Sequence, residues 1–464
     1  MRYAVMAAAL VLMAGMLGGC ADAPAASQPS EEPGAVTIRV GIWPSGSDPS
    51  AVAVWKEYEQ EMREKYPYIT LEPEPISYSF ESFIPMAVSG LLPDIFQTYF
   101  TEPQRLIANG FVADITAYAQ EYGFLTGQRA DILEVAARDG RQYGIARDAY
   151  GLSLYLNMNL FRQAGLVDEE GLPLYPETFD ELTETARLIR KRTGRAGFMM
   201  PSKDGVGGWH FCNIAWAFGA QLQYQDEQGH WRSGIDSPQT AAALQYIRDL
   251  KWEEDVLLEG EHLGWGDWIA NFATDQVAMV LAAPDAMRSL VSNFSMSKDA
   301  IAIAPVPAGP GGQYTLMGGT FYMFSANSAP EQLDACFKLM DVIGLTPHVT
   351  DNMLAAVRRE LASQVEQDLP VGPRTINVWV DTWRVTAEQA LYDEHTNVDM
   401  RLFEPYYEML DSTLCTEYSR SCQEMYRTLD GCIRAVLGDP DADIAALLAA
   451  ASEEYEKFYL GDVD

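Results

Sequence analysis

Residues 36–76 read VTIRVGIWPSGSDPSAVAVWKEYEQEMREKYPYITLEPEPI, and this stretch decides the fold. The first seven residues carry β-branched side chains at every second position, which predicts a strand. Asp48 and Pro49 then offer an N-cap and a first helical residue, and apolar residues at helical spacing follow until Pro67. The segment ITLEPEPI at 69–76 predicts a second strand.

Strands and helices continue to alternate after this stretch. Residues 80–90 predict a helix interrupted or kinked at Pro85, residues 93–100 a strand, and residues 103–111 another helix. This alternation indicates parallel βαβ units and a doubly wound sheet, so the expected class is α/β.

The same pattern returns later in the chain. Residues 152–161 predict a strand that leads into a short helix, and Thr178 with Glu181 forms a capping box before the next helix. Ser237 and Pro238 begin a further helix, and residues 272–284 predict a strand. Residues after about 400 read as helices to the end.

The N-terminal segment MRYAVMAAALVLMAGMLGGC has the layout of a secretory signal peptide. Its apolar run is shorter than the about 20 residues that a spanning helix needs. Leu17 to Cys20 resemble the bacterial lipobox, which implies cleavage after residue 19 and a lipid on Cys20. The alternative is an ordinary signal with an incidental cysteine. Residues 20–35 show no apolar periodicity and are expected to be a flexible tether.

Composition describes a large, acidic, globular chain. It has 464 residues, 48% of them hydrophobic, and a formal net charge of −34. That length accommodates two lobes of ordinary size. The negative surface repels nucleic acid phosphates, so nucleic acid is excluded as a partner.

Five cysteines remain beyond Cys20, and their spread is not a disulfide framework. They are Cys212, Cys336, Cys415, Cys422 and Cys432. The last three lie in a helix-like stretch, where residues seven apart are about 10 Å apart and too far to bridge. A bond between Cys415 and Cys422 would need a loop there and is left open.

Acidic residues near the C-terminus mimic a calcium loop without completing it. Asp439, Asp441 and Asp443 match its start, but Ile444 and Ala450 occupy the positions that require glycine and an acid. The run is interpreted as a helix N-terminus, and neither a metal nor a cofactor is expected.

Several segments, taken in order, resemble one family over nearly the whole chain after the signal. They are KYPYITLE, LPDIFQTYF, NGFVADIT, DGRQYGIARDAYGLSLYLNMNLFRQAGL, YPETFDELTETARLI, NFATDQVAMVLAAP, IAIAPVPAGPGGQYTLMGG and DPDADIAALL. Each segment is weak alone, but their order and spacing are specific. The chain resembles extracellular solute-binding protein family 1, the maltose-binding-protein type of sugar-binding lipoprotein that serves bacterial ABC importers.

The resemblance implies a two-lobed periplasmic-binding-protein-like fold (type II). Each lobe is a doubly wound sheet flanked by helices, with a ligand cleft between the lobes. It places residues 36–149 and 320–372 in the first lobe and 150–319 and 373–464 in the second. It also implies a non-enzymatic, monomeric protein outside the cytoplasm, anchored to the membrane by lipid. Its partners would be a carbohydrate, expected to be an oligosaccharide, and the permease subunits of an ABC transporter.

Sugar recognition needs aromatic rings for the apolar sugar faces and polar groups for the hydroxyls. The resemblance suggests Trp43 and Ser45, which follow the first strand, although Trp43 could equally be a packing residue. It also suggests Tyr99 and Glu102, in a segment where the maltose-binding relatives carry different residue types. That departure puts the same ligand in doubt.

Further candidates lie where the chain should cross between lobes. Arg147, Asp148 and Tyr150 occupy the first crossing, with a hinge salt bridge as the alternative. Gly319 and Thr320 belong to a turn, Gly318–Thr320, that could offer backbone N–H groups.

The second lobe supplies two candidates. Trp209 lies just before the expected helix FCNIAWAFGAQ, aligned with a sugar-stacking aromatic of the relatives, and Asp285 is expected to face it. A partly buried structural tryptophan is the alternative for Trp209. Trp252 and Trp268 are at helical spacing and are expected in the core.

Two rival functions stay open at this point. An exported carbohydrate-active enzyme would need two placed carboxylates, which 66 acidic residues can supply by chance. No nucleophile elbow, zinc motif, P-loop or dinucleotide fingerprint is present. A sugar-sensing module for a membrane kinase would have the same fold.

Overall fold

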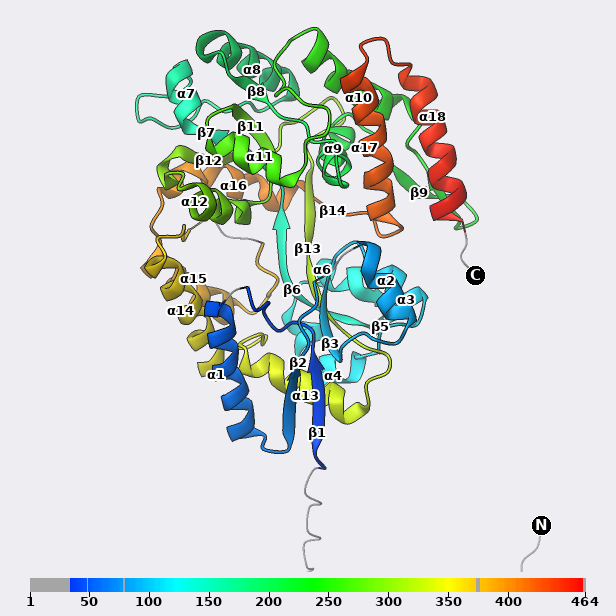
Figure 1. Ribbon diagram of the computed structural model, residues 1–464, viewed down its shortest axis with the longest axis vertical. Helices are drawn as coiled ribbons and strands as arrows, with labels where there is room; N and C mark the ends of the chain where they lie inside the picture. Colours follow the sequence, from blue (N-terminus) through cyan, green and yellow to red (C-terminus); the bar gives the residue numbers. More distant parts are fainter. Residues whose placement is uncertain (1–33, 48, 78–79, 373–375, 462–464) are drawn as a thin grey trace, which may run out of the picture. The chain divides into compact units, whose positions relative to one another are not determined.

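The computed structural model describes residues 34–47, 49–77, 80–372 and 376–461 (Figure 1). The expected signal peptide, Cys20 and most of the tether lie outside these residues. Val36–Asp464 makes one compact unit. Among the described residues, no helix is long and apolar enough to cross a membrane.

The first sheet has six strands in the order β14-β13-β3-β1-β2, and β6 also pairs with β13. They are β1 (Val36–Val40), β2 (Ile69–Pro73), β3 (Ile95–Tyr99), β6 (Gly144–Gly151), β13 (Thr315–Phe324) and β14 (Leu414–Thr416). β1 runs parallel to β2 and β3, as the alternation predicts. β13 runs antiparallel to β3, so the sheet is mixed and not wholly parallel.

Helices from two parts of the sequence accompany this sheet. The early ones are α1 (Pro49–Lys65), α2 (Phe80–Val88), α3 (Pro103–Ala108), α4 (Thr116–Glu121), α5 (Phe124–Gly127) and α6 (Ala130–Leu133). α6 runs into the 3-10 turn η1 (Glu134–Ala136) and the small hairpin of β4 (Ala137–Arg138) and β5 (Arg141–Gln142). The later ones are α13 (Pro330–Val342), α14 (Asp351–Glu366) and α15 (Thr382–His395). α2 continues through Pro85 without interruption.

The second sheet has four strands in the order β12-β7-β11-β8. They are β7 (Ser153–Asn157), β8 (Ala196–Phe198), β11 (Val277–Ala282) and β12 (Ile301–Ala304), and every residue in them is buried. β11 is parallel to β8 and antiparallel to β7. Such fully buried strands read as continuous apolar runs, which is why VAMVLA and IAIA occur here.

The second sheet is accompanied by the remaining helices. These are α7 (Met158–Ala164), α8 (Phe179–Thr193), α9 (Val206–Ala217), α10 (Pro238–Trp252), α11 (Trp265–Ala273), α12 (Met287–Phe294), α16 (Glu404–Thr413), α17 (Cys422–Gly438) and α18 (Ile444–Tyr455). Short elements complete this part: the hairpin β9 (Gln223–Gln225) and β10 (Trp231–Ser233), and the turns η2 (Pro284–Ala286), η3 (Lys298–Ala300), η4 (Met400–Leu402) and η5 (Glu456–Leu460). Thr178 caps α8 as predicted, accepting from the backbone N–H of Glu181.

Two strands connect the sheets. β6 and β13 pair antiparallel, with Gly318 opposite Tyr150 and Thr320 opposite Asp148. In Figure 1 these strands run between the two groups of elements. The predicted turn at Gly318–Thr320 is therefore wrong, because these residues lie inside β13. The prediction arose because two adjacent glycines usually mark a turn.

A third segment crosses beside these strands. The backbone N–H of Ile376 donates to the carbonyl of Ala149 at 2.8 Å. Residues 376–395 then pack on first-sheet elements, since Arg129 donates to the Val378 carbonyl and Arg384 donates to the Thr346 carbonyl. The expected lobe boundaries remain a proposal. Because residues 376–395 pack on first-sheet elements, we propose that the second part of the first lobe ends with α15 and not at residue 372.

Two smaller expectations need correction, and one is met. The C-terminal region is not wholly helical, because β14 contains Cys415. The five cysteines beyond Cys20 are all free thiols, in agreement with the expectation that they form no disulfide framework. Trp268 is fully buried as expected, but Trp252 is 42% exposed and donates to the Val436 carbonyl from the end of α10.

Candidate ligand-binding site

A pocket of about 280 Å³ lies at the carboxyl ends of β1 and β3. Ligands in open α/β sheets bind at this edge. Ten residues line it: Gly41, Ile42, Trp43, Pro44, Ser45, Ile76, Ser77, Gln97, Thr98 and Tyr99. The structure therefore brings together three of the predicted site residues, Trp43, Ser45 and Tyr99, from segments more than 50 residues apart.

The pocket offers both polar and aromatic groups. The Thr98 hydroxyl is buried and has no hydrogen-bond partner among the described residues. Such a group normally has a partner, so a ligand hydroxyl or water is expected there. Trp43 is only 8% exposed, and its ring lies 5.2 Å from the ring of Trp55. It therefore packs in the core and exposes little of its surface to the pocket.

The first crossing strand holds an ion pair beside this pocket. Arg147 Nη1 lies 3.2 Å from Asp148 Oδ2 and 3.2 Å from Gln97 Oε1, a pocket-lining atom. Asp148 Oδ1 accepts from the Thr320 backbone N–H at 3.1 Å and from its hydroxyl at 2.9 Å. Asp148 and Thr320 thus connect the two crossing strands by hydrogen bonds. The Arg147–Asp148 ion pair agrees with the alternative of a hinge salt bridge, and a ligand contact at these residues stays a prediction.

Aromatic rings from three elements meet next to the crossing strands. The ring of Trp209 lies 6.1 Å from the ring of Tyr150, at an interplanar angle of 84°. The ring of Trp265, which is 40% exposed, also lies 6.1 Å from the ring of Trp209. Trp265 was not predicted. These rings form a surface suited to apolar faces of a ligand.

Trp209 is held in place by α17. It lies in the first turn of α9, not before the helix as predicted, because α9 begins at Val206. Both carboxylate oxygens of buried Asp430 accept backbone N–H groups at this end of α9, from Gly205 at 2.6 Å and from Gly208 at 2.9 Å. A Cβ on Gly208 would lie 2.2 Å from the Tyr426 carbonyl. The glycines therefore allow α9 to contact α17 closely.

Sequence reasoning missed Glu417, which lies beside Trp209 after β14. It is buried, and Tyr426 donates to its Oε1 at 2.9 Å. Burial raises the pKa of Glu417 to about 7, hydrogen bonds from Tyr426 and Trp209 lower it, and the Glu102 carboxylate raises it. Glu102, a predicted site residue, is itself buried before α3. A carboxyl group with a pKa near neutrality is a mark of functional sites.

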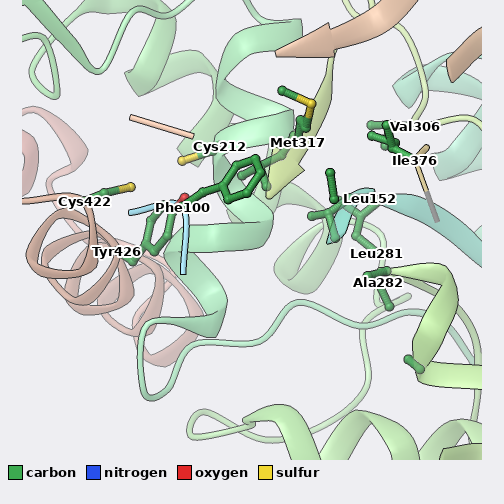
Figure 2. Close-up of a cluster of buried hydrophobic side chains, with 14 of the residues drawn as sticks. Phe100, Leu152, Cys212, Leu281, Ala282, Val306, Met317, Ile376, Cys422 and Tyr426 are labelled. Carbon is green, nitrogen blue, oxygen red and sulfur yellow. The ribbon is translucent and has the colours of Figure 1, made fainter. Parts of the chain in front are cut away.

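The surroundings of Glu417 are packed and apolar. Figure 2 shows Phe100, Cys212, Cys422 and Tyr426 in one buried cluster, and Met317 of β13 belongs to the same core. This cluster excludes water behind Glu417, which explains its raised pKa.

Polar contacts also join the first-sheet side to α17. Gln423 Nε2 donates to the Thr101 hydroxyl at 3.0 Å, and Arg105 pairs with Glu424 at 3.0 Å. The segment after β3 therefore lies directly against the N-terminal turn of α17.

Asp285 and Gly319 both lie near Asp148 of the first crossing strand. Asp285 lies in η2, and burial, followed by the Asp148 carboxylate, raises its pKa. Trp209 has ring contacts with Tyr150, His210 and Trp265. Burial raises the pKa of Tyr150, and the carboxylates of Glu417 and Asp285 raise it further. That Asp285 faces Trp209 stays a prediction. A Cβ on Gly319 would lie 2.4 Å from the Asp148 carbonyl, so this glycine permits close strand packing.

A second pocket, of about 450 Å³, is lined by Asp236, Ala449, Ser452, Glu453, Glu456 and Lys457. It has no aromatic wall and is far in sequence from the candidate site residues. Among the described residues, no group of three or more His, Cys, Asp or Glu side chains could hold a metal ion. Asp443 caps α18 by accepting from Ala446, as the helix interpretation predicts.

Comparisons with known proteins concern the family and the fold of the chain. The family profile "Bacterial extracellular solute-binding protein" matches residues 45–342. Curated binding proteins of Brucella abortus and Brucella suis are 22% identical over 213 residues, which cover 46% of this chain and 48% of theirs. The chain thus spans about half the length of the curated relatives it matches.

Solved structures match over almost the full length. Maltose-bound MalE3 of T. maritima is 21% identical with a TM-score of 0.66, covering 91% of this chain and 100% of that one. An ABC substrate-binding protein of Listeria monocytogenes in complex with cycloalternan is 17% identical, with a TM-score of 0.67 and coverages of 91% and 98%. UgpB of Mycobacterium tuberculosis, in complex with glycerophosphocholine, is 15% identical, with a TM-score of 0.68 and coverages of 92% and 98%. These matches confirm the predicted two-lobed α/β fold.

Proposed function

Because the chain belongs to the family of bacterial extracellular solute-binding proteins, we propose that it is the substrate-binding component of an ABC importer. It binds a carbohydrate, an oligosaccharide by preference, reversibly between the two sheets and delivers it to the permease. The family places the protein outside the cytoplasm.

One observation carries this proposal above the others. Tyr150 of a crossing strand and Trp209 of α9 bring their rings together beside the buried carboxyl group of Glu417. Aromatic faces next to polar acceptors are what the two kinds of sugar surface require. The pocket with the Thr98 hydroxyl adjoins this place through Tyr99, whose pKa is raised by burial and then by Glu417.

The ligands of the structural neighbours agree with a sugar without fixing it. Maltose and cycloalternan are carbohydrates, whereas glycerophosphocholine is a phosphodiester. The aromatic surface of Trp209 and Trp265 favours the carbohydrate for this chain, since flat apolar sugar faces stack on such rings.

A thermal-shift screen over oligosaccharides tests the proposal. A ligand that binds only the folded state raises the melting temperature by mass action, by an amount set by its concentration over Kd. We expect at least one oligosaccharide to raise the melting temperature of the parent and to leave Trp209→Ala less affected. If no sugar raises the melting temperature of the parent at millimolar concentration, the carbohydrate assignment is wrong.

Membrane attachment through lipid on Cys20, with residues 20–35 as the tether, is part of the proposal. Cys20→Ser should be exported and lost from the membrane fraction, since one lipidated residue provides the attachment. A variant that stays on membranes would contradict the lipid anchor and leave the binding function untouched.

A further inference from the structure

We propose that the pocket at the carboxyl ends of β1 and β3 holds one uncharged, hydroxyl-bearing end of the ligand, and that Thr98 and Gln97 recognise its hydroxyl groups. Sugars that carry a charge at this end, such as uronic acids and amino sugars, are then excluded. The inference rests on the proposed function and narrows its ligand class.

The pocket is small, and its lining is uncharged. Its volume of about 280 Å³ is close to the lower limit of about 300 Å³ for small-molecule pockets, so it takes one end of an oligosaccharide. None of the ten described residues that line it has a side chain that is charged at neutral pH. Burial raises the pKa of Tyr99, and the Glu417 carboxylate raises it further, so this phenol also stays neutral.

The Thr98 hydroxyl is the first group offered to a ligand. Thr98 lines the pocket and is 1% exposed, and its Oγ1 atom has no hydrogen-bond partner among the described residues. A hydroxyl can both donate and accept a hydrogen bond, which suits a sugar hydroxyl. Because an unpaired buried hydroxyl is unfavourable, a ligand that pairs with it binds more tightly than one that does not.

The Gln97 amide is the second group, and Arg147 orients it. Arg147 Nη1 donates to Gln97 Oε1 at 3.2 Å, so the Nε2 atom of the amide is left to donate to the pocket that Gln97 lines. The same Nη1 atom lies 3.2 Å from Asp148 Oδ2, which balances the charge of the guanidinium. Arg147 therefore offers no unpaired positive charge to an anionic ligand.

An uncharged lining selects against charged ligands. A carboxylate or ammonium group that enters the pocket loses its hydration and meets no opposite charge on the ten lining residues. The formal net charge of −34 adds a repulsion of anions. A neutral sugar loses only the hydration of its hydroxyl groups, which hydrogen bonds with Thr98 and Gln97 replace.

Calorimetry with matched sugars tests the charge requirement. The probes are neutral di- and trisaccharides of glucose, galactose and mannose, and counterparts with a uronic acid or an amino sugar at one end or at the other. We expect at least one neutral sugar to bind. With the charge at the end that enters the pocket, its acid and its amine should both bind at least about tenfold more weakly. Charged counterparts that bind as tightly as the neutral sugar, whichever end carries the charge, would overturn the inference.

Outcomes in which no neutral sugar binds are also decisive. If a charged sugar binds and no neutral sugar does, the inference is wrong and the proposed function stands. If no carbohydrate of any kind binds, both are wrong.

Variants of Thr98 assign the recognition to its hydroxyl. Thr98→Val, which replaces the hydroxyl by a methyl group, should weaken the neutral sugar by about three- to tenfold. The unliganded variant should melt at or above the temperature of the parent, because the hydroxyl has no partner among the described residues. Thr98→Ser keeps the hydroxyl and should bind nearly as tightly as the parent.

Thr413→Val is the matched control, because the buried Thr413 hydroxyl lies 2.9 Å from the Thr315 hydroxyl and is hydrogen-bonded to it. It should melt below the parent and bind the sugar normally. Unliganded Thr98→Val that melts well below the parent would show that this hydroxyl is structural, and normal sugar binding by Thr98→Val would show that it contacts no ligand. Either result overturns the inference and leaves the proposed function intact.

Gln97→Glu tests the second group separately. The variant keeps an acceptor for Arg147 and loses the amide donor, so it should weaken the same neutral sugar by at least about threefold. Unchanged binding by Gln97→Glu would contradict the role of the amide.

Discussion

The ring of Tyr150 meets the indole of Trp209 nearly edge to face, with centroids 6.1 Å apart. Tyr150 lies on a strand that connects the two sheets, and Trp209 lies on the helix that follows β8. The contact therefore joins the crossing strands to the wall that α9 and α17 build. A ligand that stacks on Trp209 would therefore also affect, through Tyr150, the two strands about which the lobes are proposed to move.

Replacing Trp209 by alanine should weaken carbohydrate binding with little loss of stability. Removal of a stacked aromatic costs about 1–3 kcal/mol of apolar contact, which is about a five- to hundredfold weaker Kd. Calorimetry and melting curves measure the two effects. Trp252→Ala, which removes a half-exposed indole from the end of α10, is the control and should bind normally. Normal binding by Trp209→Ala, or a melting temperature far below the parent, would make Trp209 structural.

Replacing Glu417 by glutamine should change how stability depends on pH. The pKa of Glu417 is raised to about 7 in the folded protein, so the folded state holds a proton that the unfolded state releases at its ordinary pKa. The free energy of unfolding of the parent therefore falls as pH rises from about 4.5 to about 7 and then levels off. The parent loses on the order of 3 kcal/mol of unfolding free energy over this pH range, and Glu417→Gln does not.

Denaturant unfolding of both proteins at pH 5 and pH 8 measures this difference. The Glu417→Gln variant should gain stability relative to the parent at pH 8. The control Glu227→Gln, at an exposed residue between β9 and β10, should keep the pH dependence of the parent. A stability difference between Glu417→Gln and the parent that is the same at both pH values would show that Glu417 titrates normally.

Replacing Gly319 by alanine should destabilise the crossing strands. The new Cβ would lie 2.4 Å from the Asp148 carbonyl and 2.6 Å from the Phe100 ring, so one of the packed strands must shift. Overpacking of this kind costs about 1–3 kcal/mol. Gly266→Ala is the control, because a Cβ there meets nothing within 4 Å and lies in helix α11. The variant Gly319→Ala should melt below the parent while Gly266→Ala does not. Equal melting temperatures would contradict the packing argument.

The strands and helices were predictable because their apolar residues repeat with the correct period. The expected strand starting at Val36 and the expected helix starting at Pro238 both formed as predicted. The turn expected at Gly318–Thr320 did not form, because these glycines serve close approach between strands and not chain reversal. Local sequence does not distinguish these two uses of glycine.

The site was predictable only in part. The resemblance to the family suggested Trp43, Ser45 and Tyr99 in advance, and all three line the pocket. Glu417 carried no local signal among 66 acidic residues, and the helices packed around it decide its importance. Trp265 was missed for a similar reason, since its proximity to Trp209 depends on how α11 packs.

The central claim is that one carbohydrate molecule binds reversibly at this site and leaves unchanged. Calorimetry with the oligosaccharide found in the screen, followed by chromatography of the recovered sugar, tests it most directly. The account predicts saturable binding of one sugar per chain, weakened in Trp209→Ala, with the sugar recovered intact after long incubation. Recovery of many equivalents of shortened sugar per chain, or unweakened binding in Trp209→Ala, would contradict it.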